Sequence, residues 1–430
     1  MSFNTGLSGL NAARADLDVT ANNIANANTT AFKRSTATFA DVFSNTQGGS
    51  VDKAGNGVRL AQISQQFDQG MIEDSNSNLH LAVNGNGFFT LEGESGPVYS
   101  RDGAFLLDDE GFLVNSAGLK VQAFPTVDSQ GSDTTDVLFA NGVLSSVKVD
   151  RGIGQPSATE NINLSVNFRA DIENVTAGAI DRDNDATFNF TNTITTYDSL
   201  GNVHEVELYV QRSADDTYTA KAYMDGGATV LQFDDGAGGT VDTFDLEFNA
   251  NGTLGLITPE GVAGTAGTFT LTAEPVTRAG ANDLNLTFDF TGSTMTGDSF
   301  AVTRQSQDGY TAGRPTGLDI DSDGTIIAGY SNGRKEVLGK IALANFDNLQ
   351  GLQSIGANGF VATTESGAAN LGEAGSASFG AIKAGSLETS NVDISQQLVR
   401  LITAQRNFQA SSRVISTNDQ ITQTAINLGR

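Results

Sequence analysis

Apolar residues recur at helical spacing near the N-terminus of the chain. Leu10, Leu17 and Ile24 are seven residues apart, and a small residue or a threonine follows each of them by three positions. No glycine occurs from residue 10 to residue 47. Such spacing is typical of a helix that packs along one narrow stripe, as helices do in coiled coils. The pattern therefore predicts a helix at the start of the chain.

A longer helical pattern occupies the C-terminal end. Neither glycine nor proline interrupts residues 391–428. Its apolar stripe, whose main row again repeats every seven residues, consists of Ile394, Leu398, Leu401, Phe408 and Ile415. A single helix over residues 392–428 spans about 55 Å at a rise of about 1.5 Å per residue. Such a rod overhangs any compact domain of this size.

The two terminal stripes need partners, and the residues leave two interpretations open. Helices of an ordinary bundle inside a globular protein show the same amphipathic pattern. However, the chain between them predicts no third long helix, and the C-terminal stripe is mixed with Gln405, Ser412 and Asp419. Polar members suit contacts between subunits better than a dry core. Two matched helices without a third partner favour self-assembly.

The interior of the chain alternates with period two, which predicts strands. Residues 80–91 and 98–114 alternate around turn sequences at residues 84–87 and 108–111. Glycine ends both turn sequences, as is common where two antiparallel strands reverse direction. We therefore expect hairpins and meanders in this region.

Further strand patterns lie between residues 150 and 309, separated by clusters of Asp, Asn and Gly. They occupy residues 187–197, 203–212, 218–224, 243–248 and 284–290. In the second of them, Val206, Leu208 and Val210 alternate with more polar side chains. This alternation predicts a sheet with one buried face, and the regular spacing of the segments indicates a sandwich or barrel.

The distribution of charge along the 430 residues separates the ends from the interior, as the helix and strand patterns also do. Residues 1–69 and 386–430 together hold 9 basic and 8 acidic side chains, so their net charge is +1 out of a total of -26. Residues 150–309 alone hold 7 basic and 24 acidic side chains, a net charge of -17. A nested organisation explains both changes in composition, because one unit is inserted into the next.

The expected fold is mixed α and β and multidomain. Paired long terminal helices, coiled-coil-like, enclose nested all-β domains of a sandwich or barrel type. The expected units are residues 1–30 with 390–430 as a terminal helical domain, 31–70 as an extended linker or hairpin region, 71–149 with 310–389 as an intermediate β domain, and 150–309 as an inserted acidic outer β domain.

Composition excludes several functions. The chain contains no cysteine, so disulfides, thiolate metal sites and thiol redox chemistry are ruled out. Its strong negative charge argues against nucleic acid or an anionic membrane as the main partner. The start of the chain lacks the basic and apolar regions of a secretory signal peptide, and no run of about 18 apolar residues predicts membrane insertion.

One acidic segment resembles a calcium loop. Asp319, Asp321, Asp323 and Gly324 match its first, third, fifth and sixth positions, but the twelfth position holds Tyr330 and not the bidentate glutamate. The segment is therefore interpreted as a β-turn. Residues 181–185 carry a similar acidic run without the required glycine and are interpreted as a solvated loop.

The remaining candidate chemistry is weak. The chain holds two histidines, His80 and His204, too few for a histidine-based metal cluster, and no Gly-x-Ser-x-Gly nucleophile motif accompanies them. Residues 84–87, Asn-Gly-Asn-Gly, lack the third glycine of a dinucleotide-binding loop and are interpreted as a turn. The sequence predicts no catalytic residue, no cofactor and no metal site.

Both ends resemble one family. Residues 6–35, with LDV at 17–19 and ANNIAN at 21–26, resemble the N-terminal signature of the axial proteins of the bacterial flagellum, and residues 385–420 resemble the C-terminal signature. Residues 81–124 are similar to the family's first β segment. The matching signature residues are Asn22, Asn23, Asn26, Asn391, Asp393, Gln405 and Arg406.

Within that family the chain is most similar to hook proteins. The insertion at residues 150–309 is missing from the shorter distal rod protein, and two turn sequences, residues 198–201 with His204 and residues 330–333, look like hook protein motifs. The resemblance implies a structural, non-enzymatic subunit that assembles with copies of itself into a flexible curved tube outside the cell. This tube couples the rod of the basal body to the filament and transmits torque.

The resemblance also implies partner proteins and a route of export from the cell. These are the distal rod protein, the hook cap, the hook-filament junction protein and the flagellar type III apparatus, which exports subunits unfolded and without a cleaved signal peptide. The terminal helices are then expected to line the tube. Their stripe residues are expected to form the seams that meet neighbouring copies: Leu10, Leu17, Ile24, Ile394, Leu398, Leu401, Phe408 and Ile415. Two other interpretations remain: a secreted acidic β-rich adhesin or carbohydrate-active protein with helical anchors, and, within the family, a rod protein.

Overall fold

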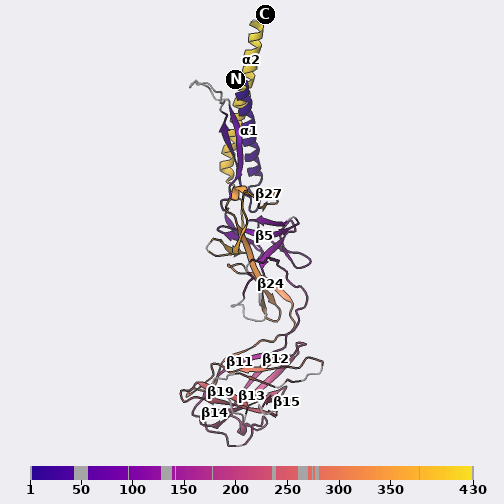
Figure 1. The fold of residues 1–430 in the computed structure, drawn as a ribbon, viewed down its shortest axis with the longest axis vertical. Helices are drawn as coiled ribbons and strands as arrows, with labels where there is room; N and C mark the ends of the chain where they lie inside the picture. The colour runs from indigo at the N-terminus through magenta and orange to yellow at the C-terminus, as the bar shows by residue number, and fades with distance from the viewer. Residues whose placement is uncertain are drawn as a thin grey trace.

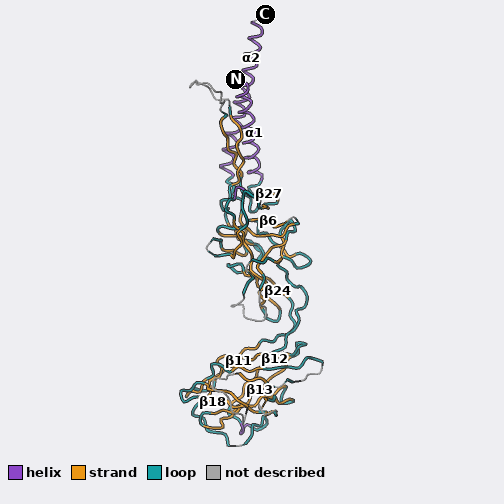
Figure 2. Tube along the Cα trace, in the orientation of Figure 1, coloured by secondary structure: helices purple, strands orange, loops and turns teal. Residues whose placement is uncertain are grey.

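The computed structural model describes residues 2–42, 57–94, 96–126, 138–140, 142–176, 178–234, 239–259, 270–273, 275–276, 280–376 and 378–428. The molecule is elongated, with two long helices at one end, a β-rich body in the middle and a second β-rich domain at the far end (Figure 1). Among these described residues, helix is confined to the first end apart from two short 3-10 turns, Asp185–Thr187 and Leu349–Gly351 (Figure 2). We refer to these three parts as the helical end, the middle body and the outer domain.

The helical end consists of α1 (Ser2–Ala25), α2 (Ile394–Leu428) and one hairpin. The predicted terminal helices are confirmed, and they lie side by side with α2 extending beyond the start of α1 (Figure 1). Asp393 begins α2, because its carboxylate accepts hydrogen bonds from the backbone N–H groups of Ser395 at 2.8 Å and Gln396 at 3.1 Å. Strands β1 (Ser35–Asp41) and β2 (Val58–Gln65) pair antiparallel and pack along α1.

The middle body is built around one large sheet. In spatial order its main strands are β24 (Pro315–Ile320), β25 (Thr325–Tyr330), β26 (Lys335–Asn345), β9 (Lys120–Phe124), β5 (Phe88–Gly93), β6 (Gly96–Ser100), β28 (Gly359–Val361) and β27 (Gln353–Gly356). The short strands that join its sides are β7 (Leu106–Leu107), β8 (Leu113–Val114), β10 (Ser145–Ser146) and β29 (Asn370–Glu373).

Two separate strand pairs connect this sheet to the helical end. Strand β3 (Ile72–Asp74) pairs with β31 (Ser386–Glu388), directly before α2, and β4 (Leu81–Asn84) pairs with β30 (Ala381–Ala384). The chain therefore enters and leaves the middle body through neighbouring strands that are about 300 residues apart in sequence. The apolar core of the body draws on both halves, with Phe89, Phe105, Ile326 and Ile341 fully buried.

One predicted hairpin is confirmed and the other is wrong. The turn at residues 108–111 joins β7 to β8, and Gly111 N–H donates to the carbonyl of Asp108 at 3.1 Å. The turn at residues 84–87 does not fold β4 onto β5, because β4 pairs with β30 while β5 pairs with β6, β9 and β26. Period-two alternation reports which face is buried, and it carries no information about the partner strand.

The outer domain contains two sheets. One comprises β20 (Thr270–Thr272), β21 (Thr287–Asp289), β11 (Asn161–Arg169), β22 (Thr294–Thr296) and β23 (Ala301–Gln307). The other comprises β12 (Phe190–Tyr197), β13 (Val203–Ala214), β14 (Thr217–Met224), β15 (Thr229–Val230), β18 (Thr243–Phe248) and β19 (Leu254–Pro259). A small separate pair joins β16 (Phe233–Asp234) to β17 (Thr240–Val241).

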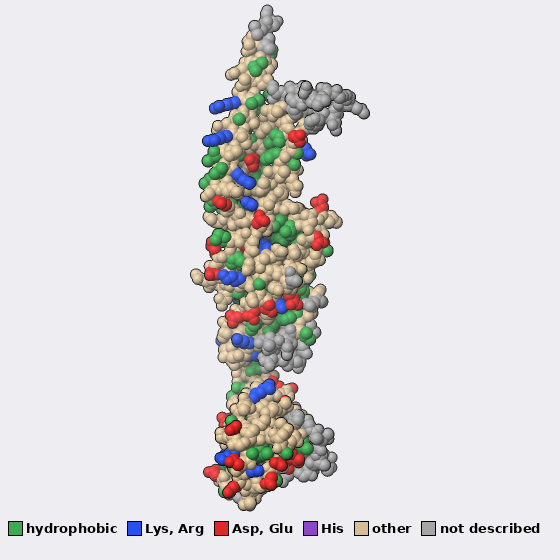
Figure 3. Space-filling view, turned by 90° about the vertical axis from the view of Figure 1, so that its left-hand side faces the viewer, with side chains coloured by type: hydrophobic (Ala, Val, Ile, Leu, Met, Phe, Trp, Pro, Cys, Tyr) green, Lys and Arg blue, Asp and Glu red, His purple; other side chains and the backbone are tan. Residues whose placement is uncertain are grey.

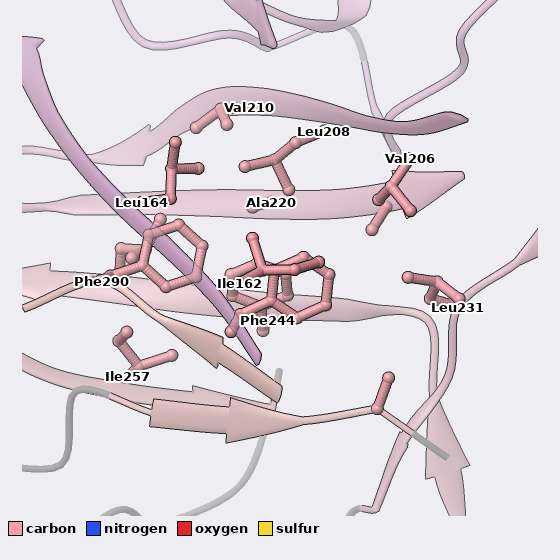
Figure 4. Packing of buried hydrophobic residues seen from close by; sticks show 14 of the residues in the cluster. Ile162, Leu164, Val206, Leu208, Val210, Ala220, Leu231, Phe244, Ile257 and Phe290 are labelled. Carbon is pink, nitrogen blue, oxygen red and sulfur yellow. The ribbon is translucent and has the colours of Figure 1, made fainter. Parts of the chain in front are cut away.

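A single apolar core lies between these two sheets (Figure 4). Val206, Leu208 and Val210 are buried in it, as their alternation predicts, and Ile162 and Leu164 face them from β11. The main strand pairings keep the two sheets separate, and an isolated bridge between Thr253, next to β19, and Thr294 of β22 joins them at one margin.

Candidate assembly surface

Helix α2 is covered along one narrow face. Its side chains with low or intermediate exposure recur at intervals of four and three residues, and every other described side chain of the helix is exposed. The covered row consists of Gln397, Leu401, Ala404, Phe408, Ser411, Ile415 and Asn418. Helix α2, with 35 residues, therefore contacts the rest of its own subunit mainly along this one stripe.

Helix α1 meets this row in the antiparallel direction, through small side chains. A Cβ atom on Gly6 would lie 3.1 Å from Cγ1 of Ile415, and one on Gly9 would lie 3.0 Å from Oγ of Ser411. At the other end of the pair, Nδ2 of Asn23 donates to Oε1 of Gln397 at 3.2 Å. Glycine at these two positions therefore allows the helices to approach closely.

The structure divides the predicted stripe residues into two groups. Leu401, Phe408 and Ile415 belong to the row that meets α1, where they are half-buried. On α1, Leu10, Leu17 and Ile24 are half-buried as well. In contrast, Ile394 is 46% exposed and Leu398 is 45% exposed. The second group is free to contact another molecule.

Further large apolar side chains are exposed along the helical end. Ile402 is 49% exposed and Ile421 is 61% exposed, although both are large aliphatic side chains. The other exposed large apolar side chains of the helical end are Phe3, Leu7, Leu60, Ile63, Val399, Val414 and Ile426. Figure 3 shows hydrophobic side chains at the surface along this end of the molecule. Leu7, Val399 and the two residues of β2 lie outside the heptad rows, so the sequence pattern did not single them out. Phe3 lies seven residues before Leu10 and extends that row by one position.

Several signature residues hold the base of the helices together. Asn23 donates to the carbonyl of Ser35 at 2.8 Å and accepts from the N–H of the same residue at 2.9 Å, which ties α1 to β1. Asn391 accepts from the backbone N–H of Arg34 at 2.8 Å and donates to the carbonyl of Gln66 at 2.8 Å. Together with the helix cap at Asp393, these contacts fix how the chain enters and leaves the two helices.

The other signature residues lie at the surface or in a turn. The side chain of Asn26 donates to the carbonyl of Asn22 at 3.0 Å, at the end of α1. Gln405 and Arg406 are exposed on α2, outside the row that meets α1. Their positions leave them accessible to another molecule.

A buried charged cluster lies between the helical end and the middle body. Nζ of Lys33 is 2.6 Å from Oε1 of Glu388, and an N–H group of Arg101 donates to its Oε2 at 3.4 Å. All three side chains are nearly inaccessible. Burial lowers the pKa of Lys33, and the neighbouring Glu388 carboxylate opposes that shift. We call these three residues the polar anchor.

Sequence reasoning missed the polar anchor because its members are as many as 355 residues apart. One signal was available, since Lys33 lies in the N-terminal signature segment and Glu388 in the C-terminal one. Lys33 also donates to the carbonyl of Asp68 at 2.8 Å, and the N–H of Gly70 donates to Glu388 at 2.8 Å. The anchor therefore also fixes the segment that follows the β1–β2 hairpin.

The candidate calcium loop is a hairpin turn, as interpreted from the sequence. Gly324 N–H donates to the carbonyl of Asp321 at 2.9 Å in the turn between β24 and β25. The Asp323 carboxylate is 3.1 Å from Nζ of Lys340 and accepts from the N–H of Thr325. Across the described part of the chain, no group of three or more His, Cys, Asp or Glu side chains is placed to hold a metal ion.

The two histidines make local contacts. Nδ1 of His80 lies 2.5 Å from Oγ of Ser75. His204 lies between two carboxylates, with Nδ1 at 3.0 Å from Asp225 and Nε2 at 3.5 Å from Asp198.

In the residues that the structure describes, no helix is long and apolar enough to cross a membrane.

Four family models match the chain, and together they cover most of it. They are the flagella basal body rod protein model over residues 3–33, the flagellar hook protein FlgE/F/G D1 domain over 82–167, the flagellar basal body protein FlaE D2 domain over 161–310, and the flagellar basal body rod FlgEFG protein C-terminal model over 383–428. Each of the first three covers a different part of the molecule: the helical end, the middle body or the outer domain.

Curated relatives match over the full length. The chain is 36% identical over 436 residues to the flagellar hook protein FlgE of Salmonella typhimurium, and 36% identical over 435 residues to that of Escherichia coli K12, with 100% of each chain covered. It is 33% identical over 459 residues to the hook protein FlgE of Borreliella burgdorferi, with 99% of each chain covered. Full coverage in these relatives includes the insertion at residues 150–309.

The fold resembles that of a hook protein of known structure. The crystal structure of the Helicobacter pylori flagellar hook protein FlgE2 aligns with 74% of this chain and all of its own, with a TM-score of 0.53 and 15% sequence identity. At that level of identity the similarity supports the fold alone.

Proposed function

The chain belongs to the flagellar hook protein family, and we propose that it assembles through the exposed apolar face of α2, which faces neighbouring copies in the wall of the hook tube. Its function is that of a structural subunit of the bacterial flagellar hook. The hook and rod families imply polymerisation of the subunit in the flagellum. Neither the adhesin nor the rod protein interpretation fits full-length relatives that are hook proteins.

The observation that carries the proposal is the apolar surface left bare on α2. Ile394, Leu398 and Ile402 follow one another at four-residue intervals on one face of α2 and are each 45 to 49% exposed, whereas soluble monomers rarely display large contiguous apolar surface. Complete burial of one such side chain contributes about 1.5–3 kcal/mol. Repeated along a helix of 35 residues and over many copies, this term is large enough to drive assembly.

We propose that α1 and α2 pair as an antiparallel coiled coil. The four-and-three spacing of the covered row on α2 supports this pairing, because alternating intervals of four and three keep one stripe facing a partner helix. Gly6 and Gly9 support it further by allowing a close approach. The pair then presents the remaining faces of α2 to other copies, as a tube-lining layer.

The proposed domain division follows the nested order expected from the sequence. Residues 1–30 with 390–430 form the tube-lining domain, 31–70 the linking region, 71–149 with 310–389 the intermediate domain, and 150–309 the outer domain. The division is supported by two apolar cores that share no residue, one built from strands of the middle body and one from strands of the outer domain.

The proposed surroundings of the subunit come from the family. The subunit is exported through the flagellar type III apparatus without a cleaved signal peptide, and it assembles under a hook cap between the distal rod protein and the hook-filament junction protein. A chain without cysteine suits this route, because it cannot form disulfides before assembly. The tube couples the rod to the filament and transmits torque, and no enzymatic step is proposed.

A double substitution on the exposed face tests the assembly proposal. Leu398→Asp with Ile402→Asp places two carboxylates where the proposal places an apolar contact, and neither side chain belongs to the row that meets α1. In a cell that lacks its own hook protein, we expect this variant to be exported and to give no hooks by electron microscopy. Asn407→Asp is the control, because it adds a charge at an exposed polar position of the same helix.

The outcome separates assembly from export. Monomer in the culture medium, without hooks, supports the proposal when the control assembles normally. Hooks of normal length from the double variant contradict it. The helix content of the purified variant, measured by circular dichroism, shows that α2 itself is intact.

A further inference from the structure

Two short chain segments connect the middle body to the outer domain. Gly154 N–H donates to the carbonyl of Gly313 at 2.8 Å, and Ser157 and Tyr310 exchange two backbone hydrogen bonds at 3.0 Å each. We call residues 154–157 and 310–313 the neck. The two segments join domains with separate apolar cores, and domains joined in this way change orientation unless further contacts hold them.

A turn from the middle body holds the neck on one side. Residues 330–333 follow β25, and Nδ2 of Asn332 donates to the carbonyl of Thr311 at 2.7 Å. The N–H of Ser331 donates to the carbonyl of Arg314 at 2.8 Å, and its hydroxyl accepts from the N–H of Arg314 at 3.0 Å. Oδ1 of Asn332 also accepts from the N–H of Arg334, so the same side chain closes its own turn.

An aromatic contact strengthens the same side. The guanidinium of Arg334 lies 4.5 Å from the centre of the Tyr310 ring in the neck. It is held there by the Glu336 carboxylate at 3.3 Å, and a hydroxyl from Tyr330 donates to that carboxylate at 3.0 Å. Burial and the hydrogen bond to Glu336 raise the pKa of Tyr330 to about 12, so the hydroxyl keeps its proton at neutral pH.

A turn from the outer domain meets the neck on another side. Residues 198–201 end in Gly201, whose φ of +82° favours glycine. A Cβ atom there would lie 2.9 Å from Cβ of Pro156 and 3.4 Å from Cα of Thr311. The turn is firm, because the Asp198 carboxylate accepts from the N–H groups of Leu200 at 2.9 Å and Asn202 at 2.8 Å.

Thr311 therefore accepts a hydrogen bond from Asn332 of the middle body, and Gly201 of the outer domain lies so close to it that a side chain there would touch its Cα. We propose that Asn332 and Gly201 are positioning residues that fix the orientation of the outer domain relative to the middle body. The two turns are those that resemble hook protein motifs in the sequence, and neither takes part in the proposed contacts of α2. Because this role belongs to a single subunit, a test of it does not depend on whether the proposed tube contacts of α2 are correct.

The absence of cysteine allows a direct measurement on the full-length monomer. Spin labels on Asp109→Cys in the middle body and Ala214→Cys in the outer domain, both exposed positions, report the distance between the domains by pulsed electron resonance. Asn332→Asp keeps the oxygen that closes the turn and replaces the donor to Thr311 with a second oxygen. Gly201→Ala pushes a methyl group against the neck.

Each variant has a matched control. Asn251→Asp makes the same change in an exposed outer-domain turn, where Asn251 only accepts hydrogen bonds through Oδ1. Gly118→Ala introduces the same methyl group at a φ of +80° in a middle-body turn, where nothing lies within 4 Å. It therefore carries the backbone strain of Gly201→Ala without the contact to the neck.

We expect a single narrow distance distribution for the labelled parent and both controls. Asn332→Asp and Gly201→Ala should broaden it about twofold or shift its mean, with unchanged melting of the two β domains, because the linked domains are then free to reorient. Parent-like distributions in both variants overturn the proposal, and so does equal broadening in the controls. If Gly201→Ala does not fold, Asn332→Asp alone decides.

Discussion

The helical end and the outer domain differ in how much of its own apolar surface each of them buries. In the outer domain, side chains from both sheets such as Phe244 and Phe288 are fully buried. The large apolar residues left exposed in its described part are Ile153, Leu200 and Val203. The helical end covers one face of α2 and leaves Leu398, among others, in solvent. The outer domain thus buries its own apolar surface, whereas under the proposed assembly other copies cover that of the helical end.

Charge follows the same division. The terminal segments are almost neutral at +1, and residues 150–309 carry -17. Apolar and nearly neutral helices suit close contacts that must hold, since little repulsion opposes their approach. An acidic surface with a closed core suits wet contacts that are weak and exchange easily. A tube that bends while it rotates requires both kinds.

The largest expected effect comes from the core of the outer domain. Phe288→Ala removes a fully buried ring and should destabilise this domain by about 3–5 kcal/mol. Calorimetry of the full chain should show a lower melting temperature for the outer domain alone, because no residue of its core belongs to the core of the middle body. Leu200→Ala, at a position 58% exposed, is the control and should change stability by less than about 0.5 kcal/mol. An equal shift of every transition contradicts the separation of the two cores.

The next effect concerns the polar anchor, which joins the helical end to the middle body. Lys33→Met removes one cation from Glu388 but leaves Arg101 beside it, and should cost about 1–3 kcal/mol. Hydrogen exchange should rise in β1 and at the start of α2, and it should stay unchanged in the outer domain. Lys383→Met breaks the exposed pair with Asp74 and should cost less than about 1 kcal/mol. Equal effects of the two variants contradict a special role for the buried cluster.

The smallest expected effect is a dependence of the outer domain on acid. Burial would raise the pKa of Asp198, but hydrogen bonds from Asn202 and Leu200 hold it below the ordinary value. The stabilisation is therefore complete above the unfolded pKa of about 3.9 and is lost as the pH falls through the lower pKa of the folded state. Melting between about pH 6 and about pH 2 should show a smaller acid-induced loss in Asp198→Asn than in the parent protein. Identical pH profiles contradict this assignment.

The sequence predicts the elements in which local periodicity dominates. The heptad spacing of Leu401, Phe408 and Ile415 matches a row that the structure covers with α1. In the outer domain, the alternation around Leu208 correctly identifies the buried face. Both patterns depend only on neighbours along the chain, because a helix or a strand repeats its faces at a fixed period.

Pairings between distant segments could not be predicted from the same signals. β4 pairs with β30 almost 300 residues later, and alternation is the same whichever strand is the neighbour. Lys33 and Glu388 are isolated charged residues in the sequence, and only their burial makes them a structural pair. Their burial exists only once the chain has passed through both β domains and brought Glu388 back beside Lys33. The contacts of Gly201 and Asn332 with the neck have the same origin, although both turns were recognisable as motifs.

The most direct test of assembly through α2 is the accessibility of Leu398 before and after the tube forms. In a Leu398→Cys variant the thiol is the only one in the chain, so maleimide labelling reports on this position alone. The thiol of Leu398→Cys should react rapidly in exported monomer and slowly in assembled hooks. As an exposed reference position in the outer domain, the thiol of Ala214→Cys should also react rapidly in exported monomer. Rapid labelling of Leu398→Cys in intact hooks would contradict the burial of this face between subunits.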